Sequence, residues 1–148
     1  MPKLSRLFVR TALAYLVAGF TAGALMLANK GVALHPFLWR LLPLHVEFLL
    51  VGWTVQFIFG VAFWILPRFG TSRGPEGVVW LSYGLLNAGV LLAGVGGLLA
   101  GSPWPVLAGR LAEMGAIGAF VVNMWPRIKP FRDVAAGGGR GHGPSRAP

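Results

Sequence analysis

Histidine can bind metals and exchange protons near neutral pH, and His45 is the histidine of this sequence that lies at the start of a long apolar stretch. At helical spacing it is followed by a face of small and aromatic residues, comprising Phe48, Leu49, Gly52, Gln56, Phe59, Gly60 and Phe63. A neutral imidazole can supply an axial nitrogen to haem iron, and such a face can accommodate a flat macrocycle beside Phe48 and Gly52. The pattern therefore predicts a haem site at His45. The structural alternative is a buried histidine hydrogen-bonded to a carbonyl, to Glu47 or to Glu113.

Two arginines are placed to neutralise the propionates of such a haem. Arg40 lies five residues before His45 and directly after Trp39, and its planar guanidinium matches a carboxylate with two hydrogen bonds. Arg110 is the second candidate. The alternatives are that Arg40 anchors the chain at a membrane interface and that Arg110 pairs with Glu113, three residues later on the same predicted helix. Pairing with Glu113 is the favoured interpretation of Arg110.

Three further ionisable residues are weaker candidates for a functional site. Glu47 could accept a proton near a redox centre, or it could face lipid headgroups. His35 precedes a proline in a predicted loop, where it faces solvent or supplies a second iron ligand. His142 lies in a glycine-rich segment and is expected to be inert.

The composition is that of a membrane protein. Charged residues make up 11% of the 148 residues, whereas soluble domains carry about 25%. Hydrophobic residues make up 55%, and the mean hydropathy is +0.68. The net charge of +9 does not indicate nucleic-acid binding, because the basic residues lie between apolar runs and form no patch. The chain has no cysteine, which excludes disulfides, iron–sulfur clusters and thiol catalysis.

The apolar runs predict an all-α, integral membrane four-helix bundle in one domain, residues 1–132. The expected spans are 8–29, 41–67, 77–100 and 105–126. Lys3 and Arg6 resemble the start of a secretion signal, but the apolar run that follows is longer than the roughly 7–15 residues typical of one, which predicts a retained first helix. Residues 133–148 are rich in glycine and arginine and are expected to be a disordered tail.

The distribution of Lys and Arg predicts the orientation. Ten of the thirteen basic residues fall on the side of the two termini, so both termini are expected in the cytoplasm of a cell whose inner (cytoplasmic) membrane holds the chain as a multi-pass protein. The polar residues His45, Glu47, Arg110 and Glu113 then lie at similar depth in the outer half of the membrane. Ionisable groups within membrane helices are costly, which makes these four the candidates for function.

Glycines at small-xxx-small spacing recur within the predicted spans. Gly19 and Gly23 lie in the first span, and Gly94, Gly96, Gly97 and Gly101 lie at the end of the third. The favoured interpretation is close packing of helices within the chain, because lipid provides no hydrophobic drive and backbones must approach one another. A dimer interface is the alternative.

The stretch RLLPLHVEFLLVGWTVQFIFGVAFWILPRF, residues 40–69, resembles the second transmembrane helix of subunit I of the haem–copper oxidases, most closely the cbb type of the C family. Arg40, Leu41, Pro43, Leu44 and His45 match the entry motif of that helix, and Arg68 matches the arginine at its end. The resemblance implies that His45 binds a low-spin haem b toward the outer face. The oxidases have many more helices and histidines than this chain, so the resemblance implies neither a copper site nor oxygen reduction by this chain alone.

Together these observations predict a b-type membrane cytochrome that transfers electrons or binds a diatomic ligand. Symmetric dimers are the commonest oligomers, so a homodimer that binds haem between paired His45 residues is the expected way to complete the iron coordination. A respiratory-chain redox partner and membrane lipid are the other expected partners. The alternatives are a haem-free accessory or assembly subunit of a respiratory complex, and a small transporter whose polar path is lined by Glu47, Arg110 and Glu113.

Overall fold

The computed structural model describes residues 2–66, 76–99 and 102–128. In these ranges the chain is helical, and four helices are long and apolar enough to cross a membrane: Lys3–Val32, Pro36–Ile65, Glu76–Leu99 and Trp104–Arg127. The all-α, four-helix prediction is therefore confirmed, and the length and composition of the helices indicate a multi-pass membrane protein. The predicted tail, together with Arg68, Gly101 and His142, lies outside the described residues.

Three of these helices are divided into segments of different winding. The first is a single helix, α1 (Lys3–Val32). The second consists of a 3-10 turn (Pro36–Leu41), α2 (Leu42–Glu47), a π-helical segment (Phe48–Val55) and α3 (Gln56–Ile65). The third consists of α4 (Glu76–Leu91), a second π-helical segment (Leu92–Gly96) and α5 (Gly97–Leu99), and the fourth of α6 (Trp104–Met124) and a 3-10 turn (Trp125–Arg127).

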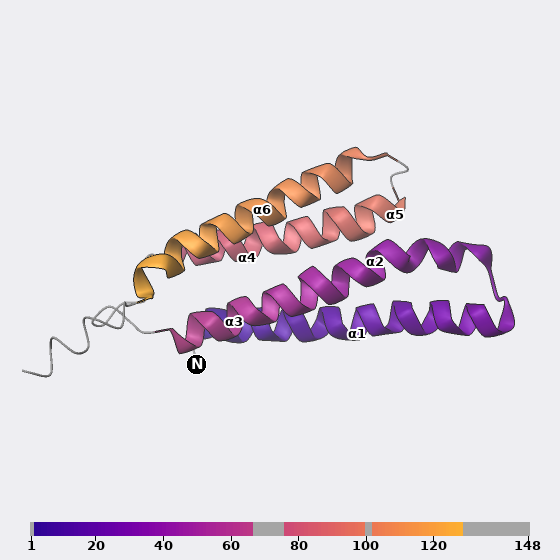
Figure 1. The fold of residues 1–148 in the computed structure, drawn as a ribbon, viewed down its shortest axis with the longest axis horizontal. Coiled ribbons are helices and arrows are strands. Elements are labelled where there is room, and N and C mark those ends of the chain that lie inside the picture. Colours follow the sequence, from indigo (N-terminus) through magenta and orange to yellow (C-terminus); the bar gives the residue numbers. More distant parts are fainter. Residues whose placement is uncertain (1, 67–75, 100–101, 129–148) are drawn as a thin grey trace, which may run out of the picture.

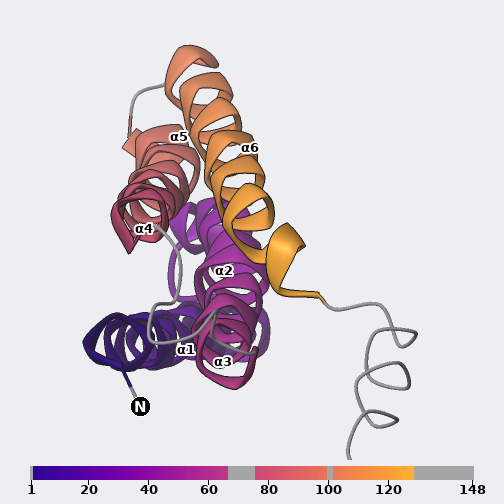
Figure 2. The ribbon, with the colours of Figure 1, turned by 90° about the vertical axis from the view of Figure 1, so that its left-hand side faces the viewer.

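The helices form two hairpins that pack side by side (Figures 1 and 2). One hairpin is α1 with α2 and α3, and the other is α4 and α5 with α6. The N-terminal end of α1 and the C-terminal end of α6 lie at the same end of the bundle (Figure 1). We call this the terminal end, and the opposite end, which holds the turn between α1 and α2, the turn end. Which end faces the cytoplasm stays a prediction.

The turn between the first two helices is built from side-chain caps. Ala33 adopts the left-handed conformation with φ of 52° and donates its backbone N–H to the carbonyl of Asn29. The Asn29 side chain then accepts the backbone N–H of His35 at 2.7 Å. Proline at position 36 suits the first turn of a helix, because a helix has no internal acceptor for that N–H.

The apolar core lies mainly toward the terminal end and joins the two hairpins. Its buried members are Leu4, Phe8, Phe59, Phe63, Val79, Leu86, Ala116, Phe120 and Met124. The rings of Phe59 and Phe120 stack with their centroids 3.9 Å apart, and Phe8 packs edge-to-face on Tyr83 at 5.0 Å. Aromatic pairs of this kind contribute about 0.5–1.5 kcal/mol beyond their buried area.

Glycines bring the helices close together, as the sequence predicts. An added Cβ at Gly19 would lie 2.7 Å from the Leu49 side chain, and one at Gly23 would lie 2.6 Å from the His45 ring. Gly94 meets Leu44 on α2 in the same way. The favoured interpretation of the glycine spacing, packing within the chain, is confirmed at these positions.

Candidate functional site

His45 lies on α2 with its imidazole held against α1. Its Nδ1 is 2.7 Å from the backbone carbonyl oxygen of Gly19, and its ring edge rests on Gly23. A carbonyl oxygen can only accept, so Nδ1 donates the hydrogen bond, and in the neutral imidazole the lone pair then lies on Nε2. Within the described residues Nε2 has no hydrogen-bond partner. The alternative of a histidine bonded to a carbonyl is thus confirmed for Nδ1, while metal binding by Nε2 stays a prediction.

The face that follows His45 on the second helix packs within the chain. An added Cβ at Gly52 would lie 2.7 Å from Cγ of Tyr15, and Phe48 packs edge-to-face on the same tyrosine ring at 5.0 Å. Phe59 is covered by Phe120. A macrocycle lying on Gly52 would have to displace Tyr15, so within one chain this face does not fit a haem.

Arg40 and His35 lie at the turn end. Arg40 is exposed, and its guanidinium carbon lies 5.6 Å from the centre of the Phe37 ring. Nδ1 of His35 accepts the backbone N–H of Phe37 at 3.1 Å and caps the 3-10 turn, which leaves only its other ring nitrogen for a ligand. The pocket beside His35 has a volume of about 210 Å³, below the roughly 300–1,000 Å³ of typical small-molecule sites.

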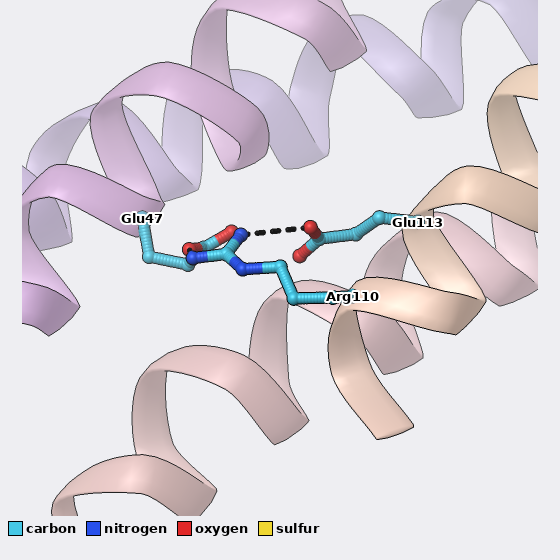
Figure 3. Close-up of polar contacts among 3 residues, drawn as sticks. All are labelled: Glu47, Arg110 and Glu113. Atoms are coloured by element: carbon cyan, nitrogen blue, oxygen red, sulfur yellow. Dashed lines mark hydrogen bonds and ion pairs between the residues drawn. The ribbon is translucent and has the colours of Figure 1, made fainter. Parts of the chain in front are cut away.

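The charged residues form a three-residue ion cluster of Glu47, Arg110 and Glu113, which links the two hairpins (Figure 3). The Arg110 guanidinium lies 2.6 Å from Oε2 of Glu47 and 2.8 Å from Oε2 of Glu113. The glutamates are buried, with exposed side-chain fractions of 3% and 8%, whereas half of the Arg110 side chain is exposed. The predicted pairing of Arg110 with Glu113 is confirmed, and Glu47 joins it. Both terminal nitrogens of Arg110 thereby have carboxylate partners, so a propionate at Arg110 would share the guanidinium with two glutamates.

Close helix packing positions this ion cluster. An added Cβ at Gly89 of α4 would lie 2.6 Å from Cγ of Glu113, and one at Gly94 would lie 3.6 Å from Cβ of Glu47. Glu47 is the last residue of α2 before the π-helical segment Phe48–Val55, and Gly94 lies within the other π-helical segment. Short π-helical segments occur frequently at functional sites. The cluster therefore lies where both helices depart from regular α-geometry.

Gln56 and Arg127 are two of the buried polar residues that the sequence did not single out as site residues. Gln56 is fully buried, and neither amide atom has a hydrogen-bond partner in the described residues. Arg127, which the sequence places among the basic residues beyond the last span, is 1% exposed. Its guanidinium donates to the carbonyls of Phe63 at 3.4 Å and Leu66 at 2.6 Å, which lie at the end of α3. An arginine directly after Trp-Pro at a helix end is the one sequence signal that points to such a cap.

Replacing Arg127 should loosen the terminal end of the bundle. In Arg127→Met the Phe63 and Leu66 carbonyls lose this donor, and the stacking of the guanidinium on the Phe63 ring at 5.4 Å is lost. We expect the free energy of unfolding, measured by denaturant titration in detergent micelles, to fall by about 1–3 kcal/mol. Arg40→Met removes an exposed arginine and serves as the control, with a loss of less than about 1 kcal/mol. Equal losses in the two variants would contradict the capping role.

His45 offers one ring nitrogen, Nε2, to a metal, because its Nδ1 is bound to the Gly19 carbonyl. In the part of the chain that the structure describes, no three histidine, aspartate or glutamate side chains come together to hold a metal ion. Through His45, one chain can therefore supply one axial nitrogen to a haem iron. Comparisons of the chain with family models, with curated proteins and with solved structures give no match.

Proposed function

We propose that this chain is a haem b-binding membrane protein in which His45 supplies one axial ligand, and that the haem is shared by two copies of the chain. The observation that carries the proposal is the hydrogen bond from His45 Nδ1 to the Gly19 carbonyl. Histidines that bind metals commonly donate their second ring N–H to a carbonyl or carboxylate, which fixes the ring and leaves the other nitrogen for the metal. Bound haem would supply one-electron transfer or diatomic-ligand binding.

The two acids that could have bound His45 have another partner. Glu47 and Glu113 both bind Arg110. No acidic side chain among the described contacts therefore binds the imidazole. His45 is partly exposed at the α1–α2 contact, so its free nitrogen is reachable from outside the packed core.

The packing of Gly52 constrains where the macrocycle would lie. Because Tyr15 covers Gly52, the proposed haem contacts the outside of the α1–α2 hairpin and needs a second copy of the chain to enclose it. Arg40, which is exposed at the turn end, is the arginine available for a propionate, since Arg110 is bound by two glutamates. The expected setting is the cytoplasmic membrane, with both termini in the cytoplasm and a respiratory-chain protein as redox partner.

Absorption spectra of the purified chain, oxidised and reduced with dithionite, test the proposal. The wild type, expressed with ample haem, is expected to show a Soret band and sharp reduced bands, with one haem for each pair of chains. His45→Ala should lose these bands. His35→Ala, which removes a histidine of the exposed turn, is the control and should keep them. A colourless wild type would contradict haem binding, and one haem per chain would contradict the shared site.

A haem-free accessory or assembly subunit is the second candidate, and the packing of the second helix favours it. Phe48, Gly52 and Phe59, which could have lined a cofactor, already contact Tyr15 and Phe120 of the same chain. In this case His45 binds no ligand, and its contacts with Gly19 and Gly23 hold α2 against α1. His45→Ala would then lower the stability of the chain, and the wild-type spectrum would show no haem.

A further inference from the structure

The two carboxyl groups of the ion cluster lie on a single guanidinium. Glu47 and Glu113 each bind Arg110 through Oε2, on the two terminal nitrogens of the guanidinium, which brings the two carboxyl groups together. Figure 3 shows both carboxyl groups at the end of the Arg110 side chain. If both glutamates were ionised, three charged groups with a net charge of −1 would lie in a membrane-spanning bundle. Two negative charges on one guanidinium repel each other, which opposes ionisation of both glutamates at once.

The second oxygen of each carboxyl group is buried without a partner. Oε1 of Glu47 and Oε1 of Glu113 are inaccessible to solvent and accept no hydrogen bond from the described residues. A buried carboxylate oxygen without a donor is costly, and most such atoms in proteins are paired. One proton between the two carboxyl groups would remove a negative charge and supply an O–H donor to a buried oxygen that otherwise has none.

No other described charged group competes for these carboxyl groups. The third helix approaches them with Gly89 and Gly94, and it carries no ionisable side chain between these positions. Between Thr11 and Asn29, α1 has no charged residue, and its Tyr15 packs on Phe48 and Gly52. His45, on the same helix as Glu47, is turned toward Gly19. Arg110 is therefore the one cation bound to both glutamates among the described residues.

We propose that Glu47 and Glu113 share one proton and, with Arg110, form a neutral proton-binding site between the two hairpins. The shared proton lies in an O–H···O hydrogen bond between the carboxyl groups, while the guanidinium binds the Oε2 atom of each. Loading the site takes one proton from water, and no other bond is made or broken. Pairs of carboxyl groups that share a proton are a known way to hold an acid and its base together. The site requires no haem, so a failure of this proposal and a failure of the proposed function can be told apart.

Infrared spectroscopy of the full chain in lipid vesicles tests the site without any substitution. A protonated carboxyl group has a carbonyl-stretch band separate from the amide bands, and this band shifts in heavy water. At neutral pH we expect a band corresponding to one protonated carboxyl group per chain. Carbon-13 labelling of glutamate should shift this band, which separates it from Asp133. A wild-type chain with no such band, or with two protonated groups, would overturn the proposal.

Single substitutions test whether the proton is shared. In Glu47→Gln and in Glu113→Gln the remaining glutamate has Arg110 to itself and is expected to ionise, so each change alone should abolish the band. Glu76→Gln is the matched control, because Glu76 is exposed and outside the ion cluster, and it should leave the band unchanged. Persistence of the full band in either cluster variant would assign the proton to one glutamate alone and contradict sharing. Where one cluster variant fails to fold, the other one tests sharing, and the labelled wild type still tests for one protonated carboxyl group per chain.

Discussion

Substitution of Gly109 by valine is expected to separate the α4–α6 hairpin. An added Cβ at this position would lie 2.6 Å from the backbone nitrogen of Ala93 and 2.8 Å from the carbonyl oxygen of Gly89. Both are backbone atoms, which cannot rotate away as a side chain can. Overpacking of a well-packed contact costs about 1–3 kcal/mol, occasionally more, and we expect Gly109→Val at or above the upper value and Gly109→Ala below it. Denaturant titration in detergent micelles, followed by the fluorescence of the six tryptophans, measures the loss.

Gly118 provides a control on the same helix. It is exposed, and an added Cβ there would meet nothing within 4 Å. Gly118→Val and Gly118→Ala carry the same change in helix propensity as the Gly109 variants, so the difference between the two positions isolates the contact with the third helix. Equal stability of Gly109→Val and Gly118→Val would show that the close approach of α4 and α6 is absent from the folded protein.

The membrane spans could be predicted because hydropathy is a local property of the chain. The predicted spans overlap all four helices, and the largest errors are at the starts of the first two helices, Lys3 and Pro36, each five residues before the predicted 8 and 41. At the first helix the cause is charge. The basic residues Lys3 and Arg6 end the apolar run in the sequence. They do not end the helix, because long cationic side chains can reach the headgroups from a helix end.

The pairing of Arg110 with Glu113 could be predicted because both lie on one helix, three residues apart. The addition of Glu47 could not be predicted in the same way, since it depends on the register between the second and fourth helices. That register follows from contacts such as those at Gly89 and Gly94, which involve three helices at once. The sequence predicts a similar depth for these residues, and depth alone does not identify partners.

The hydrogen-bond partner of His45 could not be predicted either, because it also depends on how two helices pack. A backbone carbonyl is among the partners that the sequence allows for this histidine. The sequence does not distinguish one carbonyl of the neighbouring helix from another. Gly19 becomes the acceptor because Gly19 and Gly23 let α2 approach α1 closely enough for the imidazole to reach the backbone. The aromatic and glycine residues after His45 fit a macrocycle and a neighbouring helix equally well by spacing, and in the structure Tyr15 of α1 covers Gly52.

Removal of the Arg110 guanidinium is expected to cause a loss of stability as large as that of Gly109→Val. In Arg110→Met the pair Glu47 and Glu113 must either keep an unpaired carboxylate inside the bundle or take up a further proton. Breaking a buried ion pair by removing one partner costs about 3–5 kcal/mol, and half-exposure of Arg110 argues for the lower part of this range. Arg40→Met is again the control, because its only described interaction is the one with the exposed Phe37 ring. A loss no larger than that of the control would contradict the buried ion cluster.

A charge-balanced variant separates the cost of an unpaired charge from the cost of lost packing. The triple variant Glu47→Gln, Arg110→Met and Glu113→Gln removes every charge of the cluster and keeps the side chains close to their original size. Replacement of a whole buried ion pair by neutral residues is often neutral or stabilising, so this variant should recover most of the stability that Arg110→Met loses. If it is as unstable as the single variant, the ion cluster determines the register of the two hairpins through its hydrogen bonds and not through charge neutralisation. Recovery of stability would instead show that the fold forms without these three charges, so that stability alone does not require them.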